Sequence, residues 1–109
     1  MTTIDPAAPP KIFARYLTVA GSALADPALA VHITVDVTDS RHPESGTLRP
    51  GRIDMWSRIT CTGCHMSTQT YGGNDYDQED RESMSAYLAD KSRSDAQTHA
   101  EKCRAMPGQ

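Results

Sequence analysis

The sequence predicts one α+β domain, in which a small antiparallel sheet is followed by helices at the C-terminal end. Three observations predict this class: an alternating apolar stretch at 30–39, a second one at 52–60, and a helix-capping sequence at 94–97. The chain of 109 residues has room for a single domain. Because only 38% of the residues are hydrophobic, with one Phe and one Trp, we expect a thin core.

The N-terminal 25 residues predict an arm and then a helix. Residues 1–10 contain three prolines, which favour a flexible arm outside a domain that covers 11–109. From residue 11 to residue 25 the apolar residues recur at steps of one, three and four, as in an amphipathic helix. They are Ile12, Phe13, Tyr16, Leu17, Ala20 and Leu24. Pro27 disfavours helical backbone at the residue before it, so we expect this N-terminal helix to end there.

The stretch 30–39 is the strongest strand pattern in the chain. Its apolar face consists of Val31, Ile33, Val35 and Val37, and polar residues alternate with them. One of these polar residues is His32, which we expect to be solvated. The segment 40–51 holds two prolines and two glycines and predicts an exposed connection.

A second strand is predicted at 52–60 and a third at 66–71. The apolar face of the second strand consists of Ile53, Met55 and Ile59, and Trp56 lies on its other face with Asp54 and Arg58. Two strands with one apolar face each imply a sheet covered on one side. The third stretch is rich in Thr and Ser and would complete a hairpin around residues 61–64, ending at the Gly-Gly-Asn sequence 72–74.

The C-terminal third predicts two helices. Residues 75–90 hold six carboxylates against one Arg, and the apolar residues at 84, 87 and 88 fit a short helix. Ser94 and Gln97 form a capping box, which predicts a last helix from Asp95 to about Met106. Pro107 would end it.

Charge, hydropathy and cysteine count argue against several classes of protein. The formal net charge is −3, which is not the basic footprint of a strong nucleic-acid binder. No stretch approaches the 18 apolar residues of a membrane span, and the N-terminal residues lack the pattern of an export signal, so we expect a cytoplasmic protein that does not bind membranes. An odd count of three cysteines argues against a disulfide framework.

The cysteines and one histidine form two pairs with the spacing of metal ligands. Cys61 and Cys64 lie two residues apart across a predicted turn, where Gly63 would supply backbone freedom. His99 and Cys103 lie four residues apart, on one face of the predicted last helix. A Cys₃His set fills the four tetrahedral positions of Zn²⁺ and describes a structural site. The sequence therefore predicts a zinc ion that staples a Cys-x-x-Cys knuckle to a C-terminal helix.

Other interpretations of these residues remain open. The sequence Cys-Thr-Gly-Cys-His at 61–65 also matches the attachment motif of c-type haem, which would make the chain an electron carrier. The pair Cys61 and Cys64 alone is compatible with a dithiol redox protein. His65 is an alternative to His99 as the fourth zinc ligand, although its adjacency to Cys64 would strain joint coordination.

The sequence predicts a binding protein and no enzyme. It contains no catalytic triad order, phosphate-binding loop or zincin motif, and we expect no small-molecule substrate. We expect a regulator or adaptor that binds either a protein or DNA. Arg49, Arg52 and Arg58 near the knuckle favour DNA, together with the basic last segment. The net charge of −5 over 74–90 favours a protein partner, because it would repel phosphates.

Two segments carry a resemblance to a known family. Residues 56–64 and the sequence HAEKCRAMP at 99–107 resemble small actinobacterial zinc-finger-like proteins, which are found near conjugative elements and prophages. The resemblance implies Cys61, Cys64, His99 and Cys103 as the ligand set. It implies no particular activity.

Overall fold

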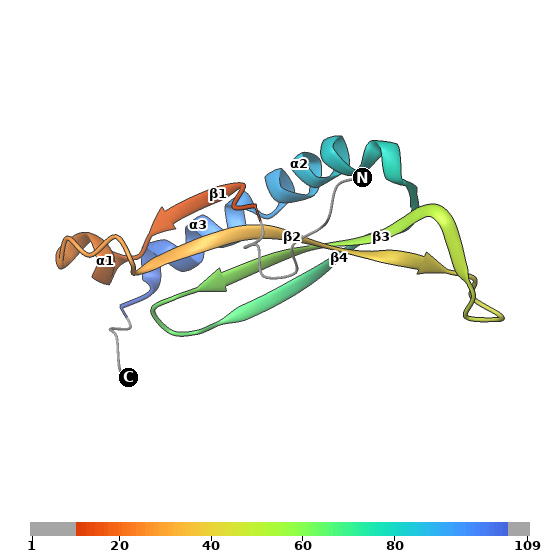
Figure 1. Ribbon diagram of the computed structural model, residues 1–109. Coiled ribbons are helices and arrows are strands. Elements are labelled where there is room, and N and C mark those ends of the chain that lie inside the picture. The colour runs from red at the N-terminus through yellow and green to blue at the C-terminus, as the bar shows by residue number, and fades with distance from the viewer. Residues whose placement is uncertain (1–10, 105–109) are drawn as a thin grey trace.

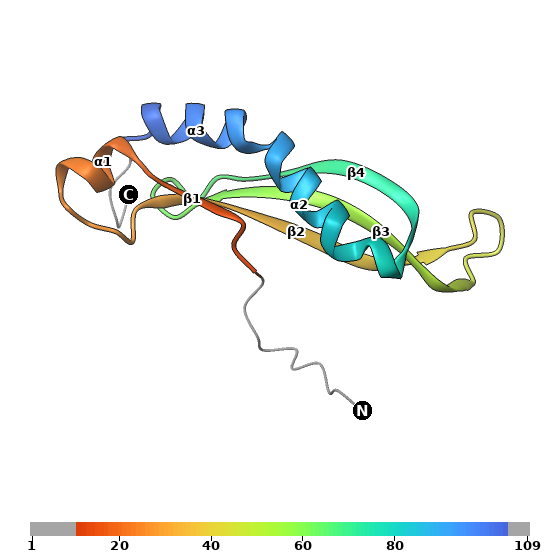
Figure 2. The same ribbon diagram turned by 90° about the horizontal axis from the view of Figure 1, so that it is seen from above.

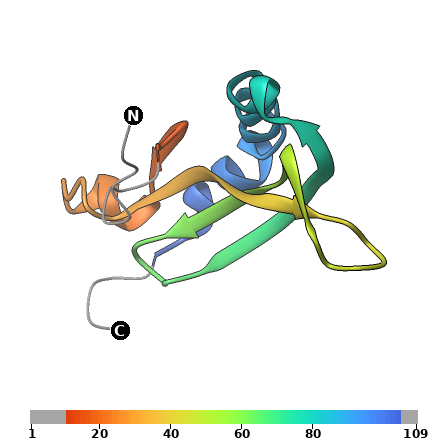
Figure 3. The same cartoon turned by 45° about the vertical axis from the view of Figure 1, so that its right-hand side comes forward.

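The computed structural model describes residues 11–104, so the expected arm at 1–10 lies outside the described residues. Within 11–104 the chain has an α+β fold, as predicted. Four antiparallel strands lie in the order β1-β2-β3-β4, and helices at the C-terminal end cover one face of the sheet (Figures 1 and 2). Figure 3 shows α2 and α3 following one another on the same side of the strands.

The two central strands are longer than their alternating patterns. β2 (Ala30–Arg41) pairs with β3 (Leu48–Cys61), and both strands extend into the predicted connection at 40–51, where Arg41 pairs with Leu48 after a register shift. Backbone pairing needs no apolar side chain, so it extends into this polar segment. A short turn closes the hairpin, where the His42 N–H donates to the Thr47 carbonyl at 2.7 Å.

The predicted third strand is confirmed as β4 (Ser67–Asp77), but it does not end at the glycines. Its pairing with β3 shifts register on both sides of the Met55–Gly73 pair, and the strand then continues to Asp77. Gly73 has a φ of 132° and Asp75 a φ of 60°, values at which a strand bulges. The Gly-Gly-Asn sequence therefore bends the strand instead of ending it.

The predicted helix over residues 11–25 is wrong. This segment forms strand β1 (Ala14–Leu17), which pairs with the start of β2, and then the short helix α1 (Val19–Ala23). Ile12, Leu17 and Leu24 of the supposed apolar stripe are each about half exposed. Pairing with β2 provides backbone partners that a helical period could not predict.

The two predicted C-terminal helices are present, and the last one begins two residues earlier than predicted. A 3₁₀ turn (Gln78–Asp80) leads into α2 (Arg81–Lys91), and α3 (Arg93–Lys102) follows after one residue, Ser92. The predicted capping box is therefore wrong, because Ser94 lies inside α3. Ser92 precedes α3 and makes no capping bond. Its buried hydroxyl donates instead to the Ser57 hydroxyl on β3 at 2.8 Å.

The buried face of the sheet carries two small apolar clusters. One surrounds Val31, Ile33 and Ile59 and includes the cysteines Cys61 and Cys103. The other consists of Ile53, Met55 and Leu88. The face assignments of β2 and β3 are thus confirmed, and Trp56 lies on the opposite face, where its ring packs edge-on against Tyr71 with centroids 5.9 Å apart.

Candidate metal centre

The four ligand candidates meet at one end of the sheet. One sulfur or nitrogen atom from each of Cys61, Cys64, His99 and Cys103 lies within 4.8 Å of all the others. Two of the separations are 3.3 Å, between Cys64 Sγ and His99 Nε2, and 3.7 Å, between Cys61 Sγ and Cys103 Sγ. Residues 35 or more positions apart thus lie close enough to hold one metal ion.

Cys61 and Cys64 are held by the turn between β3 and β4. Cys61 is the last residue of β3, and its N–H donates to the Met66 carbonyl at 2.8 Å, which closes the turn. Between the cysteines, the Thr62 hydroxyl accepts the Ala30 N–H at 2.9 Å and fixes the turn to the start of β2. The sequence did not predict this role of Thr62, because it depends on a contact with Ala30 of β2, 32 residues earlier in the chain.

His99 and Cys103 come from the last turn of α3. The Cys103 N–H donates to the His99 carbonyl at 2.9 Å, so these residues are one helical turn apart, as predicted. The Cys103 backbone is extended, with φ −76° and ψ 118°, and its carbonyl accepts the Ala20 N–H of α1 at 3.4 Å. The end of α3 is therefore anchored to α1 as well as facing the cysteine turn.

Two of the separations fit the edges of a tetrahedral thiolate site. With Zn–S bonds of about 2.3 Å, two sulfurs of a tetrahedron lie about 3.8 Å apart, and a sulfur and an imidazole nitrogen about 3.5 Å. The pairs at 3.7 Å and 3.3 Å match these edges closely. A disulfide would require about 2.05 Å, and all three cysteines are free thiols. Cys61 and Cys103 are buried, His99 is half-buried and Cys64 is exposed.

His65 stands outside this group of four. It is exposed, its ring is not among the clustered atoms, and its φ of 64° is left-handed. The sequence assigned the special backbone conformation of the turn to Gly63, which was wrong, because the left-handed residue is His65. That conformation directs the chain out of the turn toward β4 and away from the cluster.

The arginines proposed for phosphate contacts are engaged with carboxylates. Arg49 and Arg52 contact Asp75 at 2.7 and 3.1 Å, and Arg58 contacts Asp36 at 2.7 Å. Hydrogen bonds from Arg52 and then Arg49 lower the pKa of Asp75. Arg52 lies nine residues before the end of β3, about 30 Å along an extended strand. The expectation that Arg49 and Arg52 lie near the knuckle was therefore wrong.

His32 is also less solvated than its strand pattern predicts. It is half-buried on the face of the sheet opposite the helices, opposite Arg15 of β1. Burial of the ring, and secondarily the charge of Arg15, lower its pKa. His42 lies in the hairpin turn, where its Nδ1 accepts the Glu44 N–H, so neither histidine approaches the cysteine cluster.

Comparisons with known proteins found no matching family model, no matching curated protein and no matching solved structure. Every helix within residues 11–104 is too short or too polar to span a bilayer. The candidate site is thus supported by the geometry of this chain alone.

Proposed function

We propose that Cys61, Cys64, His99 and Cys103 bind one structural zinc ion and that the chain is a small, non-enzymatic regulator or adaptor. The observation that carries this proposal is the convergence of four soft donor atoms within 4.8 Å. Three thiolates and one imidazole complete a zinc tetrahedron and leave no position for water or substrate. A closed site of this kind stabilises a fold and performs no chemistry.

The location of the cluster supports a stapling role. It joins the β3–β4 turn to the C-terminal end of α3, whose buried helical residues are only the small Ala96 and Ala100. Zinc supplies about 10 to 16 kcal/mol of apparent binding free energy in finger peptides, enough to hold such a helix. The ion therefore supports the shape of a binding surface.

The alternative cofactor and redox interpretations explain less of this geometry. Covalent haem at 61–65 would use His65 and give no role to the facing pair His99 and Cys103. A thioredoxin-like pair opens a helix after a strand, whereas Cys61 and Cys64 lie between two strands. Zinc uses every clustered donor.

A protein partner is better supported than DNA. Arg49, Arg52 and Arg58, the cations expected to contact phosphates, are within ion pairs. DNA binding through them would first require Asp75 and Asp36 to be displaced. A retardation assay at about 50 mM salt, where phosphate contacts are strongest, tests DNA, and we expect no shift. The association with mobile elements that the resemblance implies stays a prediction.

Elemental analysis with an absorption spectrum tests the metal. We expect one zinc per chain and no visible band. Replacing Cys64 with Ser should reduce the zinc content and unfold the C-terminal half, whereas His65→Ser in the same turn should keep both. Iron with a Soret band would establish haem instead, and an unchanged melting curve and metal content in Cys64→Ser would refute the staple.

A further inference from the structure

The outer edge of β2 is paired over only part of its length. β1 covers the first residues of β2 and ends opposite Ile33, whose carbonyl accepts the Phe13 N–H at 2.9 Å. Backbone groups of alternate residues point to the same side of an antiparallel strand. The N–H and C=O groups of Val35, Val37 and Asp39 therefore point to this same edge, and no backbone partner from residues 11–104 meets them.

An unpaired edge attracts another strand, and proteins usually block such edges with Pro, Lys, an inward-pointing charge or a covering element. Residues 35–39 contain neither Pro nor Lys, and the register shift in the pairing of β2 with β3 comes only after Asp39. Within 35–39, Asp39 is the one charged residue on the face of Val35 and Val37, so a strand that adds here has to match it. This five-residue edge lies directly beside a cavity, whose floor includes Val35 and Val37. The two features together specify a ligand with extended backbone.

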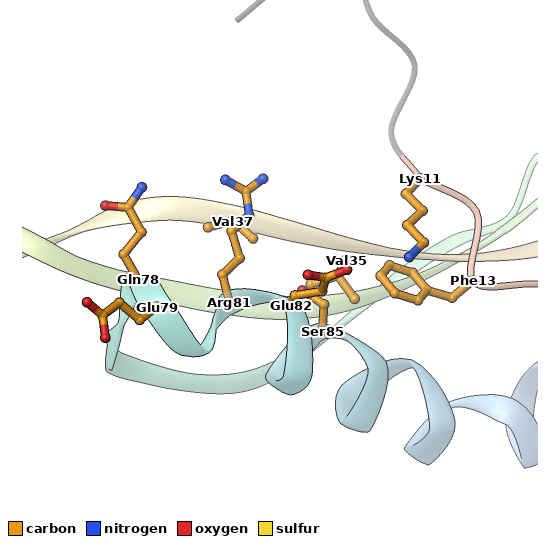
Figure 4. A pocket seen from close by; sticks show the side chains of 9 residues that line it. All are labelled: Lys11, Phe13, Val35, Val37, Gln78, Glu79, Arg81, Glu82 and Ser85. Atoms are coloured by element: carbon orange, nitrogen blue, oxygen red, sulfur yellow. The ribbon is translucent and has the colours of Figure 1, made fainter. Parts of the chain in front are cut away.

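The cavity has an apolar floor and a rim of charges of both signs. Its volume is about 480 Å³, and it is lined by Phe13, Val35 and Val37, with Ser85 of α2 beside them. In Figure 4, Arg81 lies next to Val37 and Glu82 lies near Val35. Gln78 and Glu79 lie beyond Arg81, and Lys11 lies at the opposite end. A strand on the β2 edge would direct alternate side chains into this space, because they share a face with Val35 and Val37.

We propose that an extended segment of a partner protein adds to the edge of β2 as an antiparallel strand. This direction continues that of β1 and places the first residue of the segment opposite Asp39, whose side chain shares the face of Val35 and Val37. The residue that complements this carboxylate is a Lys or Arg, followed at alternate positions by apolar residues that fill the cavity. The inference rests on the protein-binding part of the proposed function and does not depend on the metal.

A second copy of the chain fits this edge less well. Antiparallel self-pairing centred on Val37 would set Asp39 of one copy opposite Val35 of the other. Asp39 pairs with Ile53, whose side chain faces the core, so the carboxylate would lie over the apolar floor of the cavity. Burying an unpaired carboxylate is costly, which favours a different sequence as the partner.

A pool of hexapeptides, Arg-Thr-Φ-Thr-Φ-Thr with Φ as Val, Ile, Phe or Tyr, tests the proposal by fluorescence anisotropy with the full chain. We expect the best peptide to bind at least about tenfold more tightly than its counterpart with Glu in first position, and methylation of the Φ amides to abolish binding. Val37→Pro removes one outward N–H without touching the pairs with β3, so it should also lose binding. Val37→Thr keeps that N–H and is the matched control.

Zinc content and melting temperature are measured for every variant. Loss of binding in Val37→Pro with both retained supports the edge site. Equal binding by Val37→Pro, or no preference for the Arg peptides over the Glu peptides, overturns it. A dimer in sedimentation that Val37→Pro dissociates would assign the edge to a second copy and also overturn the proposal. Absence of zinc in a chain that still binds the peptides would refute the metal staple and leave this inference standing.

Discussion

The two ends of the helical layer hold the sheet in different ways. At the cysteine end, defined by the four clustered ligand residues and α3, the buried residues of the helix itself are Ala96 and Ala100. At the leucine end, defined by the cluster of Ile53, Met55 and Leu88, α2 packs the large side chain of Leu88 against the sheet. The strands supply large buried side chains at both ends, but α3 adds only small ones together with two of the candidate metal ligands.

This difference shows where the thin core needs support. Burying two alanine methyl groups contributes about 2 kcal/mol, less than the entropy lost on ordering a helix of ten residues. Leu88 alone contributes about 2 to 3 kcal/mol. We therefore expect the cysteine end to depend on the proposed ion, whereas packing stabilises the leucine end.

Removing the metal should give the largest difference in stability between the two ends. We expect chelation to raise amide exchange at Ala96 and Ala100 at least about a hundredfold, because only small side chains then hold α3. Exchange at Met55 should change much less. Hydrogen exchange read by NMR measures both ends in one sample. Equal losses at the two ends would show a single cooperative unit, and no loss at α3 would show that the helix needs no ion.

Truncating Leu88 tests the other end. Leu88→Ala should lower the free energy of unfolding by about 3 kcal/mol, through lost burial and the cavity left against Met55. Zinc content should not change, since α3 and the cysteine turn are untouched. Urea denaturation with elemental analysis measures both quantities. A loss of zinc in this variant would contradict the independence of the two ends.

A smaller effect on stability is expected at His65, the left-handed residue in the cysteine turn. His65→Gly should stabilise the chain by about 1 kcal/mol, because Gly adopts a φ of 64° without the steric cost that other residues incur. His65→Val should destabilise it, since a β-branched side chain suits this conformation least. Both variants should keep the zinc. If His65→Gly lowers the metal content, His65 is a ligand and the assignment of His99 fails.

The smallest effect concerns pH. The pKa of His32 is lowered in the folded chain, so the unfolded chain binds more protons just below pH 6.5, and stability there rises with pH. In His32→Gln, the urea midpoint should therefore change less with pH between about pH 5 and 6.5 than it does in the original chain.

The pKa of Asp75 is also lowered, but a carboxylate contributes its stability above pH 3.8 and loses it as pH falls further. Asp75→Asn should therefore remove the part of the stability loss that the original chain shows below about pH 3.8.

Some elements were predictable because their signal is local. Alternation predicted the buried faces of β2 and β3, since side chains on a strand repeat every two residues whatever lies beside it. Ligand spacing predicted both metal pairs, because a turn and a helical turn fix the distance within each pair. Segment 11–25 failed because Phe13, Tyr16 and Leu17 fit a helical period and a strand edge equally well, and pairing with β2 decided between them.

By itself the sequence determined the α+β class, the faces of the central strands and the two ligand pairs, all of which depend on residues within a few positions of each other. Only the tertiary structure decided that His99 and not His65 completes the cluster and that Thr62 fixes the turn to β2. It also decided that the outer edge of β2 beside the cavity has no backbone partner within residues 11–104. These features join residues far apart in the chain. Their distances are set by how the sheet and helices pack, which no local pattern encodes.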